Sequence, residues 1–293
     1  MSPAVAVVGP GAIGATLAAA VQRAGAELVL CGRTPLARVV VEPDAGAPDA
    51  LEGPVLTDPA AVPGPADVVL LAVKAHQTAA AAPWLGALCR PGTVVVVVQN
   101  GVEQRELVAP HAPGAVVLPS VVWFPAEVIE PGRVRLRGEP HLTLPAEPAA
   151  RAVAALLGAG GVRVELAGDF LTPAWRKLAI NAVAGLMVLA GRRAGMFRRP
   201  DVAPVAEALA AECLAVARAE GADLPEPVAA ELVAEVAAYP EDLGSSILFD
   251  REAGRTLEWD ARNAVVARLG ARHGIPTPVS DVIVPLLAAA SDD

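Results

Sequence analysis

The chain has 293 residues, of which 54% are hydrophobic, and it carries a formal net charge of −9 at pH 7. At about 150 residues per domain, this length predicts two domains, and the apolar content is sufficient for sizeable cores. The negative charge argues against a nucleic-acid partner held by phosphate contacts, so any anionic ligand must be bound by local groups.

The cysteines, histidines and apolar stretches argue against several other classes of protein. The three cysteines are widely spaced and form no C-x-x-C motif, which argues against a disulfide framework and fits a cytoplasmic location. The four histidines lack metal-ligand spacing, so we expect surface or loop histidines and no metal. We expect no secretory signal. The longest apolar stretch, 178–190, is shorter than the roughly 20 residues of a membrane span and predicts a buried helix.

Up to about residue 167, short valine-rich runs alternate with alanine-rich helical segments, a pattern typical of βαβ units and a parallel sheet. The predicted strands span Val5–Val8, Glu27–Cys31, Asp67–Val73, Thr93–Val98 and Ala115–Trp123. Residues 42–65 are rich in Pro, Gly and Asp, so we expect mostly irregular structure there. The Pro131-Gly132 turn within 127–137 and a further segment at 141–144 predict antiparallel strands at one side of the sheet.

From Phe170 onward the spacing of apolar residues is helical. The predicted helices cover 170–191, 201–220, 226–238, 257–273 and 279–290. We therefore predict an α/β domain over residues 1–167 and an all-α domain over residues 168–293.

A glycine motif, G-x-G-x-x-G, directly follows the first predicted strand and opens a helix. It consists of Gly9, Gly11 and Gly14, with Ala12 and Ile13 before the last glycine. The first glycine permits a tight turn, the second lets the backbone approach a pyrophosphate, and the third allows close helix packing. The helix N-terminus adds free N–H donors. The motif predicts a Rossmann-type dinucleotide-binding domain.

The end of the second predicted strand indicates which dinucleotide binds. A site that prefers NAD usually carries Asp or Glu there, to accept the ribose 2′-hydroxyl. This chain has Cys31-Gly32-Arg33-Thr34 instead. Arg33, helped by the Thr34 hydroxyl, would attract a 2′-phosphate, so we predict NADP(H). The alternative is that Arg33 is only a solvated surface residue.

Lysine and asparagine are scarce, which draws attention to the few that occur. The chain has two lysines, Lys74 and Lys177, and three asparagines, Asn100, Asn181 and Asn263. Burial can lower the pKa of a lysine until the ammonium gives up its proton, whereas a guanidinium stays charged. Lys74 and Asn100 each follow a predicted strand, so we expect both at the carboxyl edge of the sheet, where ligands bind.

A second group of polar residues lies in the predicted helical domain. Lys177 and Asn181 are four residues apart and therefore share a helix face. Ser246 and Glu258 begin or flank helices of the same domain. Hydroxyl, amide and carboxylate groups together suit a small polar acid.

A structural interpretation of the serine and glutamate positions remains open. Ser245 would then be the N-cap of a helix. Glu258 would be a surface charge paired with Arg262 four residues later.

These segments together resemble those of the ketopantoate reductase (2-dehydropantoate 2-reductase) family. They are G-x-G-A-I-G at Gly9, V-K-A-H-Q-T around Lys74, Q-N-G around Asn100, W-R-K-L-A-I-N around Lys177, and S-S-I-L-x-D with G-R-T-L-E-W-D at 245–260. The resemblance extends over nearly the whole chain. It implies a Rossmann domain joined to an all-α domain of the 6-phosphogluconate dehydrogenase C-terminal type, with the active site in the cleft.

The resemblance also implies a reaction and roles for individual residues. The reaction is the NADPH-dependent reduction of 2-dehydropantoate to pantoate in pantothenate synthesis. Lys177 would be the general acid, and Glu258 would bind the substrate hydroxyl. The other positions would bind substrate (Asn100, Asn181 and Ser246) or lie beside the cofactor (Lys74 and Asn100).

Some positions depart from the family pattern. Gly185 and Leu243-Gly244 stand where relatives often have an amide, and 191–197 lacks a common asparagine. A reductase of a different 2-keto acid is therefore an alternative.

Two further functions and two oligomeric states also stay open. A β-hydroxyacid dehydrogenase would share the K-x-x-x-N spacing, but normally has glycine at the place of Pro173 and an acidic residue near Arg33. A non-catalytic NADP(H)-binding sensor is the third alternative. The apolar helix at 178–190 could contact a second subunit, so a homodimer and a monomer both remain open.

Overall fold

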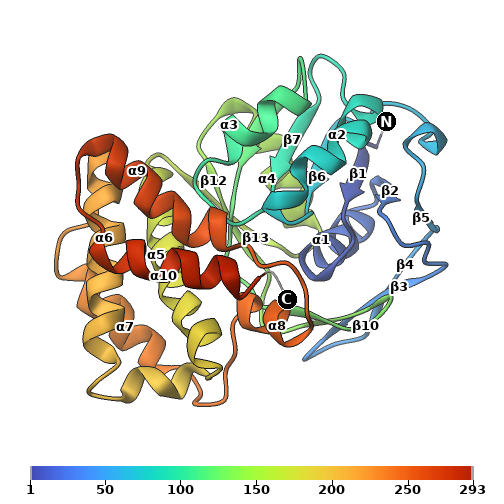
Figure 1. Cartoon of the computed structure of the whole chain (residues 1–293). Coiled ribbons are helices and arrows are strands. Elements are labelled where there is room, and N and C mark those ends of the chain that lie inside the picture. The colour runs from blue at the N-terminus through green and yellow to red at the C-terminus, as the bar shows by residue number, and fades with distance from the viewer. Residues whose placement is uncertain (1, 292–293) are drawn as a thin grey trace. The chain divides into compact units, whose positions relative to one another are not determined.

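The structure, a computed structural model, describes residues 2–291. Residues 1, 292 and 293, at the outer limits of the two predicted domains, lie outside the described residues. The chain forms two compact units (Figure 1). The first contains residues 2–99 and 103–170, and the second contains residues 100–102 and 171–291. The short segment 100–102 therefore belongs with the helical unit, although both its neighbours in the chain belong to the first.

A six-stranded sheet forms the centre of the first unit, in the order β5-β2-β1-β6-β7-β8. Every neighbouring pair in it is parallel. The strands are β1 (Ala4–Val8), β2 (Glu27–Cys31), β5 (Val55–Leu56), β6 (Val68–Leu71), β7 (Val94–Val97) and β8 (Val116–Pro119). This order is that of a doubly wound Rossmann sheet, with its topological switch between β1 and β6. The predicted fold class of the N-terminal part is confirmed.

Both faces of this sheet are covered, which explains its uninterrupted valine runs. Val5 and Val7 of β1 face a core that includes α1 (Ala12–Arg23), whereas Ala6 and Val8 face a core that includes α2 (Thr78–Leu88). Successive side chains of a strand point to opposite faces, so a strand that is buried on both sides must be apolar throughout.

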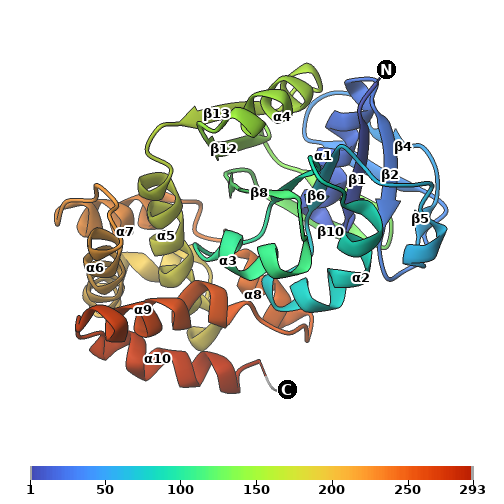
Figure 2. The same ribbon diagram turned by 90° about the horizontal axis from the view of Figure 1, so that it is seen from above.

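Two smaller sheets belong to the same unit. One is four-stranded, in the order β10-β11-β3-β4, and the other is three-stranded, in the order β13-β12-β9. Their strands are β3 (Val39–Pro43), β4 (Asp49–Leu51), β9 (Val121–Val122), β10 (Ala126–Glu130), β11 (Arg133–Leu136), β12 (His141–Pro145) and β13 (Arg163–Ala167). Figure 2 shows α4 (Pro148–Ala159) along β12 and β13. The short helices of this unit are η1 (Pro59–Ala61), η2 (Ala75–Gln77), α3 (Gln104–Val108) and η3 (Ala109–His111).

These sheets correct several of our predictions. Residues 42–65 are mostly irregular, as predicted, but the two short strands β4 and β5 within them were not predicted. The strand predicted at 115–123 is divided into β8 and β9, which belong to different sheets. The hairpin at 127–137 forms, but β11 pairs in parallel with β3 and not with the main sheet. The partner strands are distant in the chain, so local sequence cannot select the pairing.

The second unit is all-helical, as predicted. Its helices are α5 (Leu171–Ala190), η4 (Ala194–Arg198), α6 (Ala203–Ala219), α7 (Val228–Ala238), α8 (Ser246–Glu252), η5 (Asp260–Ala264), α9 (Val265–His273) and α10 (Pro278–Ala289). Helix α5 packs against α6, α7, α8, α10 and η5, and its Trp175 is fully buried. The helix predicted at 257–273 begins with a π-helical turn, η5, which the sequence did not indicate. Among the described helices, none combines the length and apolar character needed to cross a membrane.

A buried carboxylate fixes the start of α10. Glu212 of α6 accepts the backbone N–H groups of Val279 and Ser280 at 2.6 and 2.8 Å, and the Ser280 hydroxyl at 2.7 Å. These N–H groups at a helix N-terminus have no partner within the helix. The carboxylate therefore joins α10 to the core of the second unit.

Glu212→Ala should lower the free energy of unfolding by about 2–4 kcal/mol, because it leaves buried donors without an acceptor. Chemical denaturation measures the change. Glu207→Ala, on an exposed position of the same helix, is the matched control and should have little effect. Equal stability of the two variants would contradict this role of Glu212.

Candidate active site

The glycine loop between β1 and α1 has the geometry of a phosphate cradle. Gly9 has a φ of +93°, which few residues other than glycine adopt. The Gly11 N–H donates to the Gly9 carbonyl at 2.8 Å, and a Cβ at Gly14 would lie only 2.2 Å from that carbonyl. Gly11 is exposed, with open space where a side chain would stand. The loop leaves a bare backbone before the first turn of α1, at Ala12 and Ile13, which fits the pyrophosphate of a dinucleotide.

Arg33 lies in the loop that follows β2, next to β1 in the sheet. Its side chain is exposed, as is that of Thr34, and Arg33 forms no hydrogen bond or ion pair with any other residue from 2 to 291. No carboxylate occurs between Cys31 and Leu36. A guanidinium that is not engaged within the protein can bind an anion.

Lys74 follows β6, which adjoins β1 on its other side. Its backbone N–H donates to Gln77 Oε1 at 3.2 Å, and this contact opens η2. The side chain of Lys74 is half-buried. The glycine loop, Arg33 and Lys74 therefore follow the carboxyl ends of three neighbouring strands, at the edge of the sheet where the sequence predicted a ligand.

Buried polar side chains that we did not predict hold the ends of β7 and β8. Gln99 Nε2 donates to Thr78 Oγ1 at 2.9 Å. Gln104 Nε2 donates to the Ser120 carbonyl at 3.0 Å, and Ser120 Oγ donates to the Val97 carbonyl at 2.7 Å. These bonds fix where β7 ends and therefore where the chain leaves the sheet before Asn100. Glutamine is also scarce in this chain, and that scarcity was the available signal.

Within the helical unit, four of the predicted residues are joined by hydrogen bonds into one chain. Asn100 Nδ2 donates to Glu258 Oε2 at 2.9 Å, and Asn181 Nδ2 donates to Asn100 Oδ1 at 3.2 Å. Arg262 continues the chain, because its Nη2 donates to Asn181 Oδ1 at 3.1 Å and its Nη1 donates to Ser246 Oγ at 2.9 Å. We name this row, Ser246-Arg262-Asn181-Asn100-Glu258, the polar chain.

Lys177 lies on α5, one turn before Asn181. Burial lowers the pKa of its ammonium to about 8, and the charge of Arg262 adds to this effect while Glu235 opposes it. Removing an ammonium from water disfavours its charged form, and a neighbouring cation does the same. A lysine in this state holds its proton at neutral pH but can release it readily, as a general acid must.

The structure decides both open interpretations at the serine and glutamate positions. Ser245 is the N-cap of α8, where its Oγ accepts the Leu248 N–H at 3.4 Å, so the capping interpretation is confirmed. Glu258 is only 4% exposed, so the interpretation as a surface charge is wrong. Arg262 is 1% exposed, so it is not a surface partner either, and the sequence did not predict it among the candidate site residues. Its spacing from Glu258 was the signal that could have indicated it.

Other side chains fill two of the positions where the family amides are missing. A Cβ at Gly185 would lie 3.1 Å from both terminal atoms of the Asn263 side chain. A Cβ at Gly244 would lie 2.3 Å from Arg193 Nη1 and 2.7 Å from the Phe249 ring. The missing side chains therefore make room for an amide and a guanidinium that come from elsewhere in the chain.

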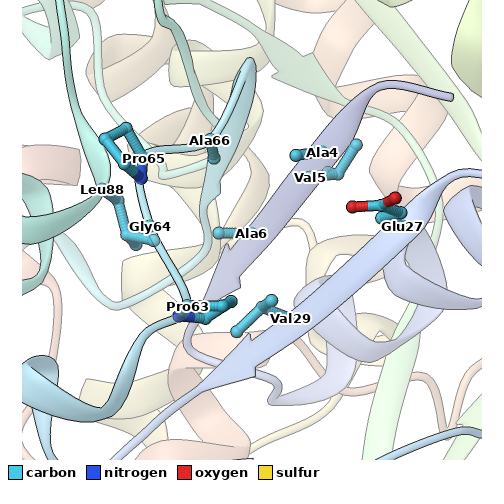
Figure 3. Close-up of a pocket in the computed structure, with 10 residues that line it drawn as sticks. All are labelled: Ala4, Val5, Ala6, Glu27, Val29, Pro63, Gly64, Pro65, Ala66 and Leu88. Carbon is cyan, nitrogen blue, oxygen red and sulfur yellow. The ribbon is translucent and has the colours of Figure 1, made fainter. Parts of the chain in front are cut away.

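One hollow of the first unit lies away from all these residues. Its lining comes from the beginnings of β1 and β2, from residues 63–66 before β6, and from Leu88 (Figure 3). Glu27 supplies the only carboxylate among otherwise apolar or backbone groups. Because it lies at the amino edge of the sheet, this hollow is not the predicted dinucleotide site.

Comparisons with known proteins agree along the whole chain. Residues 5–148 match the family model of ketopantoate reductase PanE/ApbA, and residues 169–291 match its C-terminal model. A 2-dehydropantoate 2-reductase of Mycobacterium tuberculosis is 54% identical over 292 residues, which cover 100% of this chain and 99% of that protein. One from Caulobacter vibrioides is 39% identical, with 98% and 99% covered.

Solved structures show the same relationship. A ketopantoate reductase of the PanE/ApbA family from Ralstonia eutropha has a TM-score of 0.90 at 30% identity, with 98% of each chain covered. A dimeric ketopantoate reductase from Staphylococcus aureus has a TM-score of 0.89 at 26% identity, also with 98% of each chain covered. The chain therefore belongs to the ketopantoate reductase family of nicotinamide-dependent oxidoreductases.

Proposed function

We propose that this chain reduces 2-dehydropantoate to pantoate with NADPH, as a step of pantothenate synthesis. The observation that carries the proposal is Lys177, whose lowered pKa and place on α5 put a labile proton one turn from the polar chain. The close relative from M. tuberculosis, which bears the name of this activity, supports the choice of substrate.

The two predicted domains would have different roles. Residues 1–167 would bind the cofactor, through Gly9, Gly11, Gly14 and the first turn of α1, with Arg33 on the 2′-phosphate and Lys74 and Asn100 beside the nucleotide. Residues 168–293 would bind the substrate. Bound NADPH supplies a hydride to the ketone carbon.

Lys177 would act on the ketone oxygen. As the carbonyl is reduced, negative charge develops on its oxygen, and the ammonium stabilises that charge and then transfers its proton to form the new hydroxyl. The lysine is left neutral and takes up a proton again from water. An arginine in its place could stabilise the charge but would not release a proton.

The polar chain would hold the remainder of the substrate. Glu258 accepts hydrogen bonds, so it suits the substrate hydroxyl, while Ser246 and the amides of Asn100 and Asn181 suit the oxygens of a 2-keto acid. Since Asn263 and Arg193 occupy the space at Gly185 and Gly244, the departures from the family pattern leave no empty volume there.

NADPH consumption should be rapid with 2-dehydropantoate and slow with other 2-keto acids. Lys177→Ala should lower kcat/KM by about 10²–10⁴-fold, the usual contribution of a general acid, and Lys177→Arg should restore little of it. If 2-dehydropantoate is not reduced and another 2-keto acid is, the proposed substrate is wrong. If no keto acid reacts but NADPH binds, the sensor alternative gains support.

The pH dependence of the reduction follows from the direction of the Lys177 pKa shift. The reaction requires the protonated lysine, so kcat/KM should be level below pH 8 and fall as pH rises past about 8. An ordinary lysine would keep its proton, and the activity, to beyond about pH 10. Steady-state rates between pH 6 and 10.5 test this, and a level profile to pH 10 would contradict it.

Arg33→Ala should raise the KM for NADPH by about 10–100-fold, because one or two charge-assisted hydrogen bonds to the 2′-phosphate are lost. The KM for NADH should stay unchanged. Arg151→Ala, an exposed arginine of α4, is the matched control. An equal effect of Arg33→Ala on both cofactors would exclude recognition of the 2′-phosphate by Arg33.

A further inference from the structure

We propose that Arg262 is a positioning residue that sets the direction of the hydrogen bonds to Ser246 and Asn181 in the polar chain, and so makes Ser246 a donor toward a substrate oxygen. The assignment of Ser246 and Glu258 to substrate rests on the proposed function. The direction of hydrogen bonding rests on the geometry of the chain alone.

The direction follows from the chemistry of the guanidinium. A carboxamide can be turned either way round, but arginine only donates. Arg262 Nη2 meets the Asn181 side chain at 3.1 Å, so Oδ1 of Asn181 must face it. The amide nitrogen of Asn181 is then directed to Asn100, whose own oxygen must face Asn181. The Asn100 nitrogen donates to the Glu258 carboxylate, which only accepts and therefore favours the same direction from the other end of the chain.

The same argument applies at the other end of the chain. Arg262 Nη1 donates to Ser246 Oγ at 2.9 Å, so the serine oxygen is an acceptor in this contact. Ser246 is exposed, and its hydroxyl proton remains to be donated outward. The polar chain thus presents a donor at Ser246 and an acceptor at Glu258, which matches an acid that carries a carboxylate and a hydroxyl.

Burial makes this direction firm. Arg262 is 1% exposed in the π-helical turn η5, and the carboxylates of Glu258 and Asp250 favour its charged state. Its Nη2 also lies 3.4 Å from the Asn181 backbone carbonyl. A buried cation costs several kcal/mol unless it is paired and hydrogen-bonded. Rotating one of these partners so that it no longer accepts from Arg262 would therefore be strongly unfavourable.

Three variants distinguish the effect of Arg262 on hydrogen-bond direction from the effect of its charge and from a general loss of folding. Arg262→Met removes the donors and the charge but keeps a flexible, unbranched side chain, whereas Arg262→Lys keeps the charge with a compact head that lacks the planar fork. Arg268→Met is the control, because it removes an exposed arginine of α9 that pairs with Asp260 at 3.1 Å.

The first measurement needs no substrate. The chain has only three asparagines, so ¹⁵N-asparagine labelling gives three side-chain amide signals in the full-length protein. In Arg262→Met, the signal of Asn181 should shift and its protons should exchange with water at least tenfold faster. The Asn263 amide, which donates to the Ala182 carbonyl at 3.0 Å, should keep its signal and so report that η5 still packs.

The second measurement uses turnover. Arg262→Met should raise the KM for 2-dehydropantoate about 10–100-fold, as expected for lost charge-assisted hydrogen bonds, while the KM for NADPH changes little. Arg262→Lys should fall between this variant and the wild type. If Arg262→Met loses the Asn263 signal or does not fold, Arg262→Lys decides by the same amide shifts and KM.

The outcomes distinguish this inference from the proposed function. If the wild type does not reduce 2-dehydropantoate, the proposed function fails, and the amide signals still test the direction of hydrogen bonding. If the wild type is active but Arg262→Met and Arg262→Lys keep the amide signal of Asn181, or keep the wild-type KM, the inference is overturned.

Discussion

The burial of a single guanidinium is the constraint on which the helical unit's polar chain depends. Arg262 is enclosed by the second unit, and a charge in such a place needs several acceptors around it. Ser246 and Asn181 supply hydrogen-bond acceptors, and Glu258 and Asp250 supply opposite charge. Burial lowers the pKa of Lys177, and the charge of Arg262 lowers it further, so the group that orients the amides also makes the lysine a stronger acid.

The first unit depends on a different constraint, the close approach of two backbone segments in the glycine loop. Gly14 stands so close to the Gly9 carbonyl that no side chain fits, and this contact brings the N-terminus of α1 against the end of β1. The valine runs of the sheet, covered on both faces, give that loop a rigid base. The first unit thus offers bare N–H groups to an anion, whereas the second offers side chains of both polarities to a small acid.

Much of the fold could be predicted because its signals are local. Alternating strands and helices, the glycine motif after β1 and the change to helical spacing after residue 170 each lie within a short segment. The smaller sheets could not be predicted, because β3 finds its parallel partner in β11, far along the chain. The π-helical turn η5 was also missed, since nothing in its five residues distinguishes it from an α-helix.

The sequence by itself determined which chemistry-bearing groups are present and the spacing of those that are near neighbours. Lys177 and Asn181 share a face of α5 because they are four residues apart. Only the tertiary structure brought Asn100 to Glu258 and Asn181 and buried Arg262 among them. The physical reason is that these contacts join residues that are far apart in the chain. The packing of whole helices, and not local spacing, decides which of these residues are in contact and which are buried.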